Sequence, residues 1–520
     1  MQMRYRWVTA ISICVLLLCM AIPRPAAGGD STKALSVIVD TIADRSDEAQ
    51  AIAEYLRAVG VSAEVRVWEW SALKERILAG ERQMYLTDWG SAYFDPFDLA
   101  VPKLKTGDRG NYSFYSNPRF DAALDTALAV RDHEARRRAY FEAQKILRPD
   151  APWVFGYSLR ETEAARADVL DWQPSMDSRM NLHDVGLKRG DTIVVGMAAD
   201  GMLTLDPAAY RDRATETVIR NMFDGLVTRT VDGRIVPEIA ESWSAVSDTE
   251  YIFRIRRGVK FHNGDALTAD DVVFSFDRVI RDGAMGGRTS PRKGLLGPLA
   301  AVEKVDSHTI KVRLSSPFPV LLQAMVHVQI VPRDYLMRVG DDAFARKPVG
   351  CGPFRFVEGR LDDKVVMERF DGYYGGSPDL PPVGSARVTR AIFRMMPDPT
   401  VRVAALKTGE VHIIQTVPAH LASSLARDRN LQVKSAEGTR VYCIEMNCAR
   451  PPFDDVRVRV AVNHAIDWDA ILTAIYLGSA TRLATAFLPS GFGYDAELAP
   501  YSYDPNKARA LLAEAGYGGR

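Results

Sequence analysis

The sequence predicts an α/β protein of more than one domain, because of its length and of an alternating pattern near its start. With 520 residues, the chain is too long for one hydrophobic core, and two or three domains are expected. Residues 35–39 and 61–67 have the apolar or alternating character of strands, and residues 47–59 between them carry apolar side chains at helical spacing. A second helix, closed by Gly80, and a strand at 84–89 follow. This β-α-β-α-β order predicts a parallel sheet covered by helices.

The first 28 residues have the pattern of a secretory signal. Arg4 and Arg6 precede an apolar stretch at 8–22, and the small residues at 26–28 offer a cleavage site. Crossing a bilayer takes about 20 apolar residues, so this stretch is short for an anchor. We therefore expect residues 1–28 to be removed and the mature protein to be soluble in the periplasm. A retained membrane anchor is the alternative.

Composition and motifs argue against several classes of function. The 66 basic residues balance the 66 acidic ones, which favours neither nucleic acid nor an anionic membrane surface as a partner. The sequence holds no phosphate-binding GxxxxGK[ST] loop, no HExxH, no G-x-S-x-G and no CxxC. None of its eight histidines lies four residues from another. No catalytic residue, cofactor or metal is therefore predicted.

Three cysteines remain after the signal, and an odd number leaves at least one thiol unpaired. Cys443 and Cys448 lie five residues apart in a strand-like run, so their side chains should point to opposite faces. We expect both, together with Cys351, to be unpaired and buried. A disulfide between Cys443 and Cys448 is the alternative, and it would require a bend.

The rest of the chain alternates between helical and strand-like segments. A long helix is expected at 118–147, and a fresh strand begins at 192–197. The last helix begins after Asp504 and ends at Gly516. A return strand normally follows such a helix within about 2 to 6 residues, whereas the strand at 35–39 has no helix before it. We expect that strand to lie beside the last helix.

Six runs in the second part of the chain resemble the dipeptide-, oligopeptide- and nickel-binding proteins of ATP-driven importers, which are family 5 of the extracytoplasmic solute-binding proteins. In order they are LDPAAYRDRATETVIRNMFDGLV (205–227), IVPEIAESW (235–243), FRIRRGVKFHNGDALTADDVVFSFDRVI (253–280), PVGCGPFRF (348–356), NCARPPFDDVRVRVAVNHAID (447–467) and YDPNKARALLAEAGY (503–517). Residues 47–81 and the run MYLTDWGSAYFDP (84–96) resemble the part of the family that normally follows the last of these runs. The resemblance therefore implies a circularly permuted member of the family.

The same resemblance implies a two-lobed periplasmic binding protein of the Venus-flytrap type (class II, cluster C) with an extra α+β domain. Lobe one would comprise residues 152–227 and 331–436, the extra domain 228–330, and lobe two 33–151 and 437–520. The implied function is that of a monomeric periplasmic receptor. It would capture a small peptide-like or other small organic solute between the lobes and deliver it to the permease of an ABC importer. A sensory or chaperone-like receptor and a secreted hydrolase are the alternatives.

One loop is the first candidate for lining the cleft. Trp89 and Tyr93 offer apolar walls and Asp95 an acceptor; alternatively, Trp89 packs inside the lobe and Asp95 shapes a turn. In peptide-binding relatives this loop carries a carboxylate three residues after the tryptophan, which pairs with the amino group of the peptide. Here that position is Ala92, which cannot offset a buried ammonium charge.

Three further places complete the set of candidate ligand contacts: the turn after the strand at 440–447, a lobe-one loop at 202–210 and an aromatic pair late in the chain. The residues concerned are Asn447, Cys448, Arg450, Asp206, Tyr210, Phe487 and Tyr494. Each has a structural alternative, namely a turn contact, a solvated charge or a place in the core.

Overall fold

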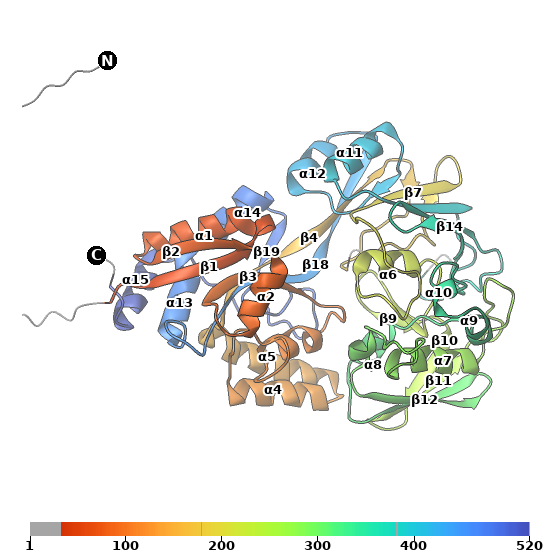
Figure 1. The fold of residues 1–520 in the computed structure, drawn as a ribbon, viewed down its shortest axis with the longest axis horizontal. Helices are drawn as coiled ribbons and strands as arrows, with labels where there is room; N and C mark the ends of the chain where they lie inside the picture. The colour runs from red at the N-terminus through yellow and green to blue at the C-terminus, as the bar shows by residue number, and fades with distance from the viewer. Residues whose placement is uncertain (1–32, 178, 381–382, 519–520) are drawn as a thin grey trace, which may run out of the picture.

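A large mixed sheet runs through the computed structural model of the protein, which describes residues 33–177, 179–380 and 383–518 (Figure 1). The expected signal at 1–28 lies outside the described residues. In order across the sheet, the strands are β14 (Phe354–Arg360), β15 (Lys364–Arg369), β16 (Arg390–Met395), β7 (Thr192–Met197), β17 (Ile413–Ile414), β4 (Trp153–Arg166), β18 (Leu431–Met446), β3 (Met84–Gly90), β1 (Ser36–Ile42) and β2 (Ser62–Trp68). The short β19 (Ala480–Arg482) pairs with β4.

Strands β4 and β18 connect the two lobes as an antiparallel pair. Residues 431–437 of β18 pair with 160–166 of β4 in lobe one, and residues 441–445 pair with 153–158 in lobe two. The register shifts between these two stretches, at Gly438, where a Cβ atom would collide with the Leu159 carbonyl oxygen. On β4, Tyr157 contributes to a core of lobe two, whereas Ala164 and Ala165 contribute to cores of lobe one; the expected boundary at 152 stays a prediction.

Lobe two contains the predicted β-α-β-α-β segment. β1 pairs with β2 and with β3 in parallel, and α1 (Ser46–Ala58) and α2 (Trp70–Leu78) form the connections. The apolar core on one side of the sheet includes side chains of α1, α13 (Val456–Ala465), α14 (Trp468–Tyr476) and α15 (Pro505–Glu514). A second core lies against α4 (Pro118–Ala129) and α5 (His133–Asp150). The segment expected to be one helix is thus two, because the Asp132 side chain accepts the backbone N–H of Ala135 and starts a new helix.

The strand at the start of lobe two lies beside the last helix, as expected. The backbone N–H of Lys33 donates to the Gly516 carbonyl oxygen at 3.1 Å, and Lys33 forms a parallel bridge with Tyr517. Figure 1 shows the red and the blue ends of the described chain together at one edge of lobe two. The contact is confirmed, while the permuted order of the family segments stays a prediction.

Lobe one and the extra domain form the other half of the molecule (Figure 1). Lobe one packs its end of the large sheet against α6 (Arg213–Ile219), α9 (Arg333–Val339), α10 (Asp341–Phe344), α11 (Pro399–Thr408) and α12 (Ala419–Leu425). The extra domain has a four-stranded antiparallel sheet of β10 (Ala240–Ala245), β11 (Glu250–Ile255), β13 (Thr309–Leu314) and β12 (Leu299–Asp306), packed with α7 (Ala269–Ile280) and α8 (Leu321–Met325). Among the described residues, no helix combines the length and the apolar character needed to cross a bilayer.

Candidate functional site

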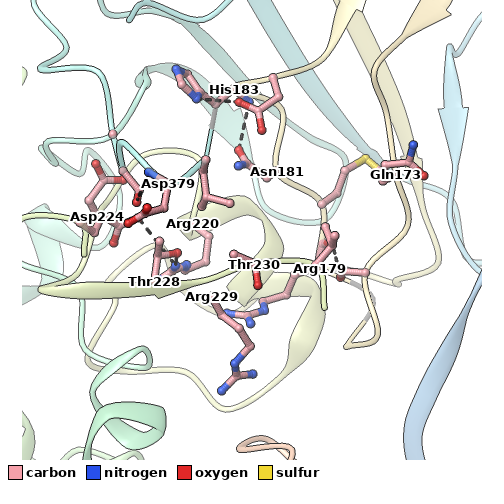
Figure 2. A pocket seen from close by; sticks show the side chains of 18 of the residues that line it. Gln173, Arg179, Asn181, His183, Arg220, Asp224, Thr228, Arg229, Thr230 and Asp379 are labelled. Atoms are coloured by element: carbon pink, nitrogen blue, oxygen red, sulfur yellow. Dashed lines mark hydrogen bonds and ion pairs between the residues drawn. The ribbon is translucent and has the colours of Figure 1, made fainter. Parts of the chain in front are cut away.

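A cavity of about 860 Å³ lies where lobe one, the extra domain and a loop of lobe two meet (Figure 2). Its wall comes from residues 171–184, from residues 220–238, which include the hairpin of β8 (Val227–Arg229) and β9 (Ile235–Pro237), and from residues 353–387. Lobe two contributes Phe94. The volume is in the range of sites that take small organic molecules.

The loop of lobe two is built around the partly buried carboxylate of Asp98. Asp98 accepts hydrogen bonds from the Ser91 hydroxyl at 2.7 Å, from the backbone N–H of Tyr93 at 3.0 Å and from that of Ala92. Burial raises the pKa of Asp98 to about 6, although these donors oppose the shift. The indole N–H of Trp89 donates to the Asp98 carbonyl oxygen at 2.8 Å. Trp89 therefore holds the loop in shape.

Asp95, expected as a possible acceptor for the solute, is engaged inside lobe two. Both terminal nitrogens of Arg136 donate to its carboxylate at 2.7 Å, and the Tyr140 hydroxyl donates at 3.1 Å. The same carboxylate accepts the backbone N–H of Phe97 at 3.0 Å and caps a short helical turn. These contacts fit the structural alternative given above for Asp95, while its role toward a solute stays a prediction.

The same loop packs into the extra domain. The Tyr93 hydroxyl donates to the Leu295 carbonyl oxygen, and Tyr93 belongs to the apolar core of that domain. The ring of Phe97 meets that of Phe318 edge-on, with centroids 5.0 Å apart. Because these contacts join lobe two to the extra domain, the structure shows the two halves closed against one another.

Two side chains reach the backbone carbonyl of Ala92 from across this junction. Arg229 Nη1 donates to the Ala92 oxygen at 3.0 Å, and His327 Nε2 lies 3.2 Å from it. Phe94, with the unusual φ of 58° for a residue with a side chain, places its ring 4.1 Å from the Arg229 guanidinium carbon. At Ala92 the loop is thus held across the junction through its backbone carbonyl.

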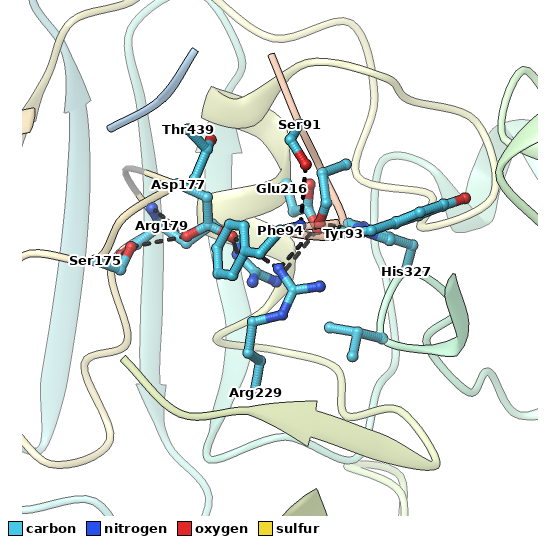
Figure 3. A network of polar contacts seen from close by, with 12 residues as sticks. Ser91, Tyr93, Phe94, Ser175, Asp177, Arg179, Glu216, Arg229, His327 and Thr439 are labelled. Carbon is cyan, nitrogen blue, oxygen red and sulfur yellow. Dashed lines mark hydrogen bonds and ion pairs between the residues drawn. The ribbon is translucent and has the colours of Figure 1, made fainter. Parts of the chain in front are cut away.

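Arg229 belongs to a largely buried cluster of five charged side chains beside the cavity. Figure 3 shows four of them, Asp177, Arg179, Glu216 and Arg229, and the fifth is Arg292. Arg179 pairs with Asp177, and its Nη1 lies 3.5 Å from Glu216 Oε1. Arg229 Nη1 lies 3.7 Å from Asp177 Oδ2, and Arg292 Nη2 lies 4.0 Å from Glu216 Oε1. Burial disfavours ionisation of Asp177, but Arg179 and Arg229 outweigh it and hold its pKa below the usual value. The arginines and His327 likewise keep the pKa of Glu216 well below its usual value, against the effect of burial.

A second group of carboxyl side chains lies elsewhere on the wall. Asp224 accepts the hydroxyls of Tyr373 at 3.0 Å and Tyr374 at 2.7 Å, and Glu238 accepts the backbone N–H of Gly225 at 2.6 Å. Burial, together with the charge of Asp224, raises the pKa of Glu238 to about 8. At neutral pH, Glu238 therefore adds little negative charge to the cavity.

The structure does not bring the other predicted contacts to the cavity. Asp206 forms a buried ion pair with Arg278, whose two terminal nitrogens donate at 3.0 and 2.7 Å. Tyr210 is buried under Arg292, whose guanidinium carbon lies 4.0 Å from the ring centroid. Phe487 is buried in the core of lobe two, where Tyr494 packs partly buried against the same cluster.

The turn after β18 lies at the wrong end of its strand to face the cavity. β18 pairs with β3 so that Val441 faces Trp89 and Met446 faces Met84, and five residues of strand span about 16 Å. Asn447 is buried and donates to the carbonyls of Gly80 and Arg82, and Cys448 packs against lobe two. Arg450 is exposed in the following turn. These three residues do not line the cavity described above, and their role as ligand contacts stays a prediction.

Sequence reasoning missed the charged cluster. Its members come from four separate stretches, at 177–179, 216, 229 and 292, and none shows a local motif. The three cysteines in the described part of the chain are free, as expected for Cys351, Cys443 and Cys448. Cys351 and Cys443 are buried as expected, whereas Cys448 is only partly buried. In the part of the chain that the structure describes, no group of three or more His, Cys, Asp or Glu side chains is placed to hold a metal ion.

Two lobes joined by a pair of strands, with a cavity at their junction, define a two-lobed binding protein. The family model of the bacterial extracellular solute-binding proteins, family 5 (middle region), matches residues 234–520. The chain therefore belongs to that family.

Three curated relatives resemble parts of the chain. The dipeptide-binding protein of Escherichia coli (strain K12) is 32% identical over 303 residues, which cover 54% of this chain and 55% of that protein. The glutathione-binding protein GsiB of Pectobacterium atrosepticum is 32% identical over 319 residues, covering 60% and 59%. Heme-binding protein A of Haemophilus influenzae is 33% identical over 303 residues, covering 54% of each chain. The chain thus spans between about half and three fifths of the length of these relatives.

Solved structures give the same assignment of the fold. HbpA2 from Haemophilus parasuis matches with a TM-score of 0.54 and 29% identity, over 63% of this chain and 67% of that one. The periplasmic binding protein DppA from Helicobacter pylori, in complex with the peptide STSA, matches with a TM-score of 0.52 and 27% identity, over 63% and 66%. The two-lobed α/β fold class predicted from the sequence is confirmed.

Proposed function

We propose that this protein is a periplasmic receptor that encloses a small organic solute in the cavity of about 860 Å³ and delivers it to the permease of an ABC importer. The observation that carries the proposal is the composition of the cavity wall, in which Phe94 of lobe two completes a surface made by lobe one and the extra domain. A solute held there contacts both halves only when they are closed, so binding favours closure. The role is binding without turnover, by a monomer.

The relatives support a small organic solute without fixing its identity. They are named for a dipeptide, glutathione and heme, three ligands of different chemistry. At Ala92 this chain has no carboxylate to pair with the amino group of a peptide. The solute class is therefore a small peptide-like molecule or another small organic molecule, recognised by groups other than residue 92.

Native mass spectrometry tests the proposal. Residues 29–520 would be exported to a bacterial periplasm, purified and sprayed from ammonium acetate. A single adduct of one small molecule per chain is expected, lost after partial unfolding in guanidinium and dialysis. Dipeptides, reduced glutathione and heme would then be titrated into the emptied protein by calorimetry. A protein that carries no adduct and binds none of these probes would contradict the proposal.

We also infer that the family segments stand in circularly permuted order. The hydrogen bond from Lys33 to Gly516 and the shared core of α1, α13 and α15 support this inference, because they make residues 33–151 and 437–518 one lobe. A rearranged gene that joins residue 518 to residue 33 and opens the chain between residues 189 and 190 should yield a protein with the same circular dichroism and the same bound solute. An insoluble or unfolded product from several such junctions would speak against it.

A further inference from the structure

One edge of the Arg229 guanidinium group has no hydrogen-bond partner. Among the described residues, Nη1 alone is engaged, by the Ala92 carbonyl and Asp177, while Nε and Nη2 are buried and unpaired. The side chain is 1% exposed. Donors buried in this way cost stability, because they have lost water without gaining an acceptor. Such a site is suited to an acceptor that comes from outside the chain.

The geometry of the free edge selects the kind of acceptor. Nε and Nη2 point the same way from a planar guanidinium group and match the two oxygens of one carboxylate, or two oxygens of a phosphate, as a bidentate pair. The guanidinium carbon of Arg229 lies over the Phe94 ring, 4.1 Å from the ring centroid. A single hydroxyl or carbonyl would satisfy only one of the two donors.

The charges around Arg229 are also unbalanced. Within ion-pair distance of one another, the described cluster holds three guanidinium groups, of Arg179, Arg229 and Arg292, and two carboxylates, of Asp177 and Glu216. Nη2 of Arg292 is a further buried nitrogen without a hydrogen-bond partner in the described structure. Within ion-pair distance the cluster thus holds one more cationic than anionic group. The Asp98 carboxylate also acts on Arg229 from further off, and an incompletely neutralised buried charge is costly.

The cluster lies where a solute can reach it. Arg179 and Arg229 both line the cavity, and Figure 2 shows them apart from Asp224 and Asp379 on its wall. Phe94, which lines the same cavity and covers Arg229, belongs to the loop of lobe two that closes against the extra domain. Nε and Nη2 are covered in this closed arrangement, so an entering molecule would have to bind them before the loop that carries Phe94 closes.

We propose that the solute carries an anionic group, a carboxylate or a phosphate, and that Arg229 binds this group through Nε and Nη2, with Arg179 beside it. This inference rests on the proposed receptor function and adds the chemical class of the solute. Arg229 is then the residue that determines specificity for an acid over its neutral counterpart. Its remaining nitrogen, Nη1, holds the Ala92 carbonyl, so that the same side chain contacts the solute and the closing loop.

The test uses three pairs of probes that differ only in the acid: a dipeptide and its C-terminal amide, an N-acetyl amino acid and its amide, and glucose 6-phosphate and glucose. Affinities would be measured by calorimetry on the emptied full mature chain, for the wild type and for Arg229→Gln and Arg229→Lys. Arg254→Gln is the matched control, because Arg254 is an exposed arginine on β11 of the same domain. Thermal unfolding of each variant shows that it is folded.

We expect the wild type to bind the acid of at least one pair about 10- to 100-fold more tightly than its neutral partner, the range for a charge-assisted bidentate contact. Arg229→Gln should abolish this difference, Arg229→Lys should restore part of it, and Arg254→Gln should leave it unchanged. Equal binding of acid and neutral probes, or discrimination that survives in Arg229→Gln, would overturn the assignment and leave the receptor function standing. No binding of any probe by the wild type would refute the receptor function for these solutes, and this inference with it.

Discussion

Removing the Asp95 carboxylate should damage the fold of lobe two rather than the recognition of solute. The Asp95 and Arg136 side chains are 2% and 6% exposed, and two bonds of 2.7 Å join them. Asp95→Ala leaves the Arg136 guanidinium buried without its partner, and breaking one side of a buried pair costs about 3–5 kcal/mol. In the double variant with Arg136→Met no charge is left unpaired, so its cost should be well below the sum of the two single costs.

Urea unfolding followed by tryptophan fluorescence measures these differences, and calorimetry gives the affinity for a bound probe. Asp248→Ala is the control, because Asp248 is 63% exposed in its pair with Arg131 and should cost no more than about 0.5 kcal/mol. A loss below about 1 kcal/mol in Asp95→Ala, or strictly additive single and double variants, would refute the reasoning. A loss of probe affinity at unchanged stability would return Asp95 to the binding site.

Three further predictions follow from buried groups. Gly438→Ala should lower the unfolding free energy by about 1–3 kcal/mol, because the added Cβ meets the Leu159 carbonyl oxygen. Gly294→Ala is the control and should not lower it, because there is open space around Gly294. An unchanged urea midpoint for Gly438→Ala would contradict this reasoning. Burial raises the pKa of Glu163 to about 8, so the native state keeps a proton that the unfolded chain releases above about pH 4.5. The free energy of unfolding should therefore fall as pH rises from 4.5 to 8. In Glu163→Gln, the thermal midpoint should change less with pH across that range. Burial raises the pKa of the Cys351, Cys443 and Cys448 thiols, so iodoacetamide at pH 8 should label the native protein slowly. The urea-unfolded protein should be labelled at all three sites. Fewer than three labels in the absence of reductant would reveal a disulfide.

The local architecture of lobe two could be predicted because it depends on short-range patterns. Alternation and helical spacing predicted the first strand, helix and strand correctly. The return strand missing after Gly516 predicted that the first strand lies beside the last helix, as its contact at Lys33 shows. The break between α4 and α5 was missed, because apolar spacing continues across it while the capping contact of Asp132 is a matter of a few atoms.

The candidate site was largely beyond the sequence, because it is assembled from distant charges. Asp95 and Asp206 look like acceptors free for a solute, yet their arginine partners lie 41 and 72 residues further along the chain. Arg229 lies in no recognisable sequence motif. It is distinguished only by its two buried nitrogens, Nε and Nη2, which have no hydrogen-bond partner in the described structure. Pairing of buried charges is a property of the packed structure, and a single sequence does not display it.

The antiparallel pair of β4 and β18 restricts how the halves of the molecule can travel. Pairing on both sides of Gly438 keeps the two strands from sliding past one another, whereas the interrupted stretch between residues 437 and 441 leaves room for bending and twisting. Opening of the two lobes should therefore follow essentially one rotational path. Solute entry and solute release would then proceed through the same series of lobe orientations. Solutes of different size would then have to be accommodated by the cavity itself, because the rotation of the lobes offers few stable intermediate positions.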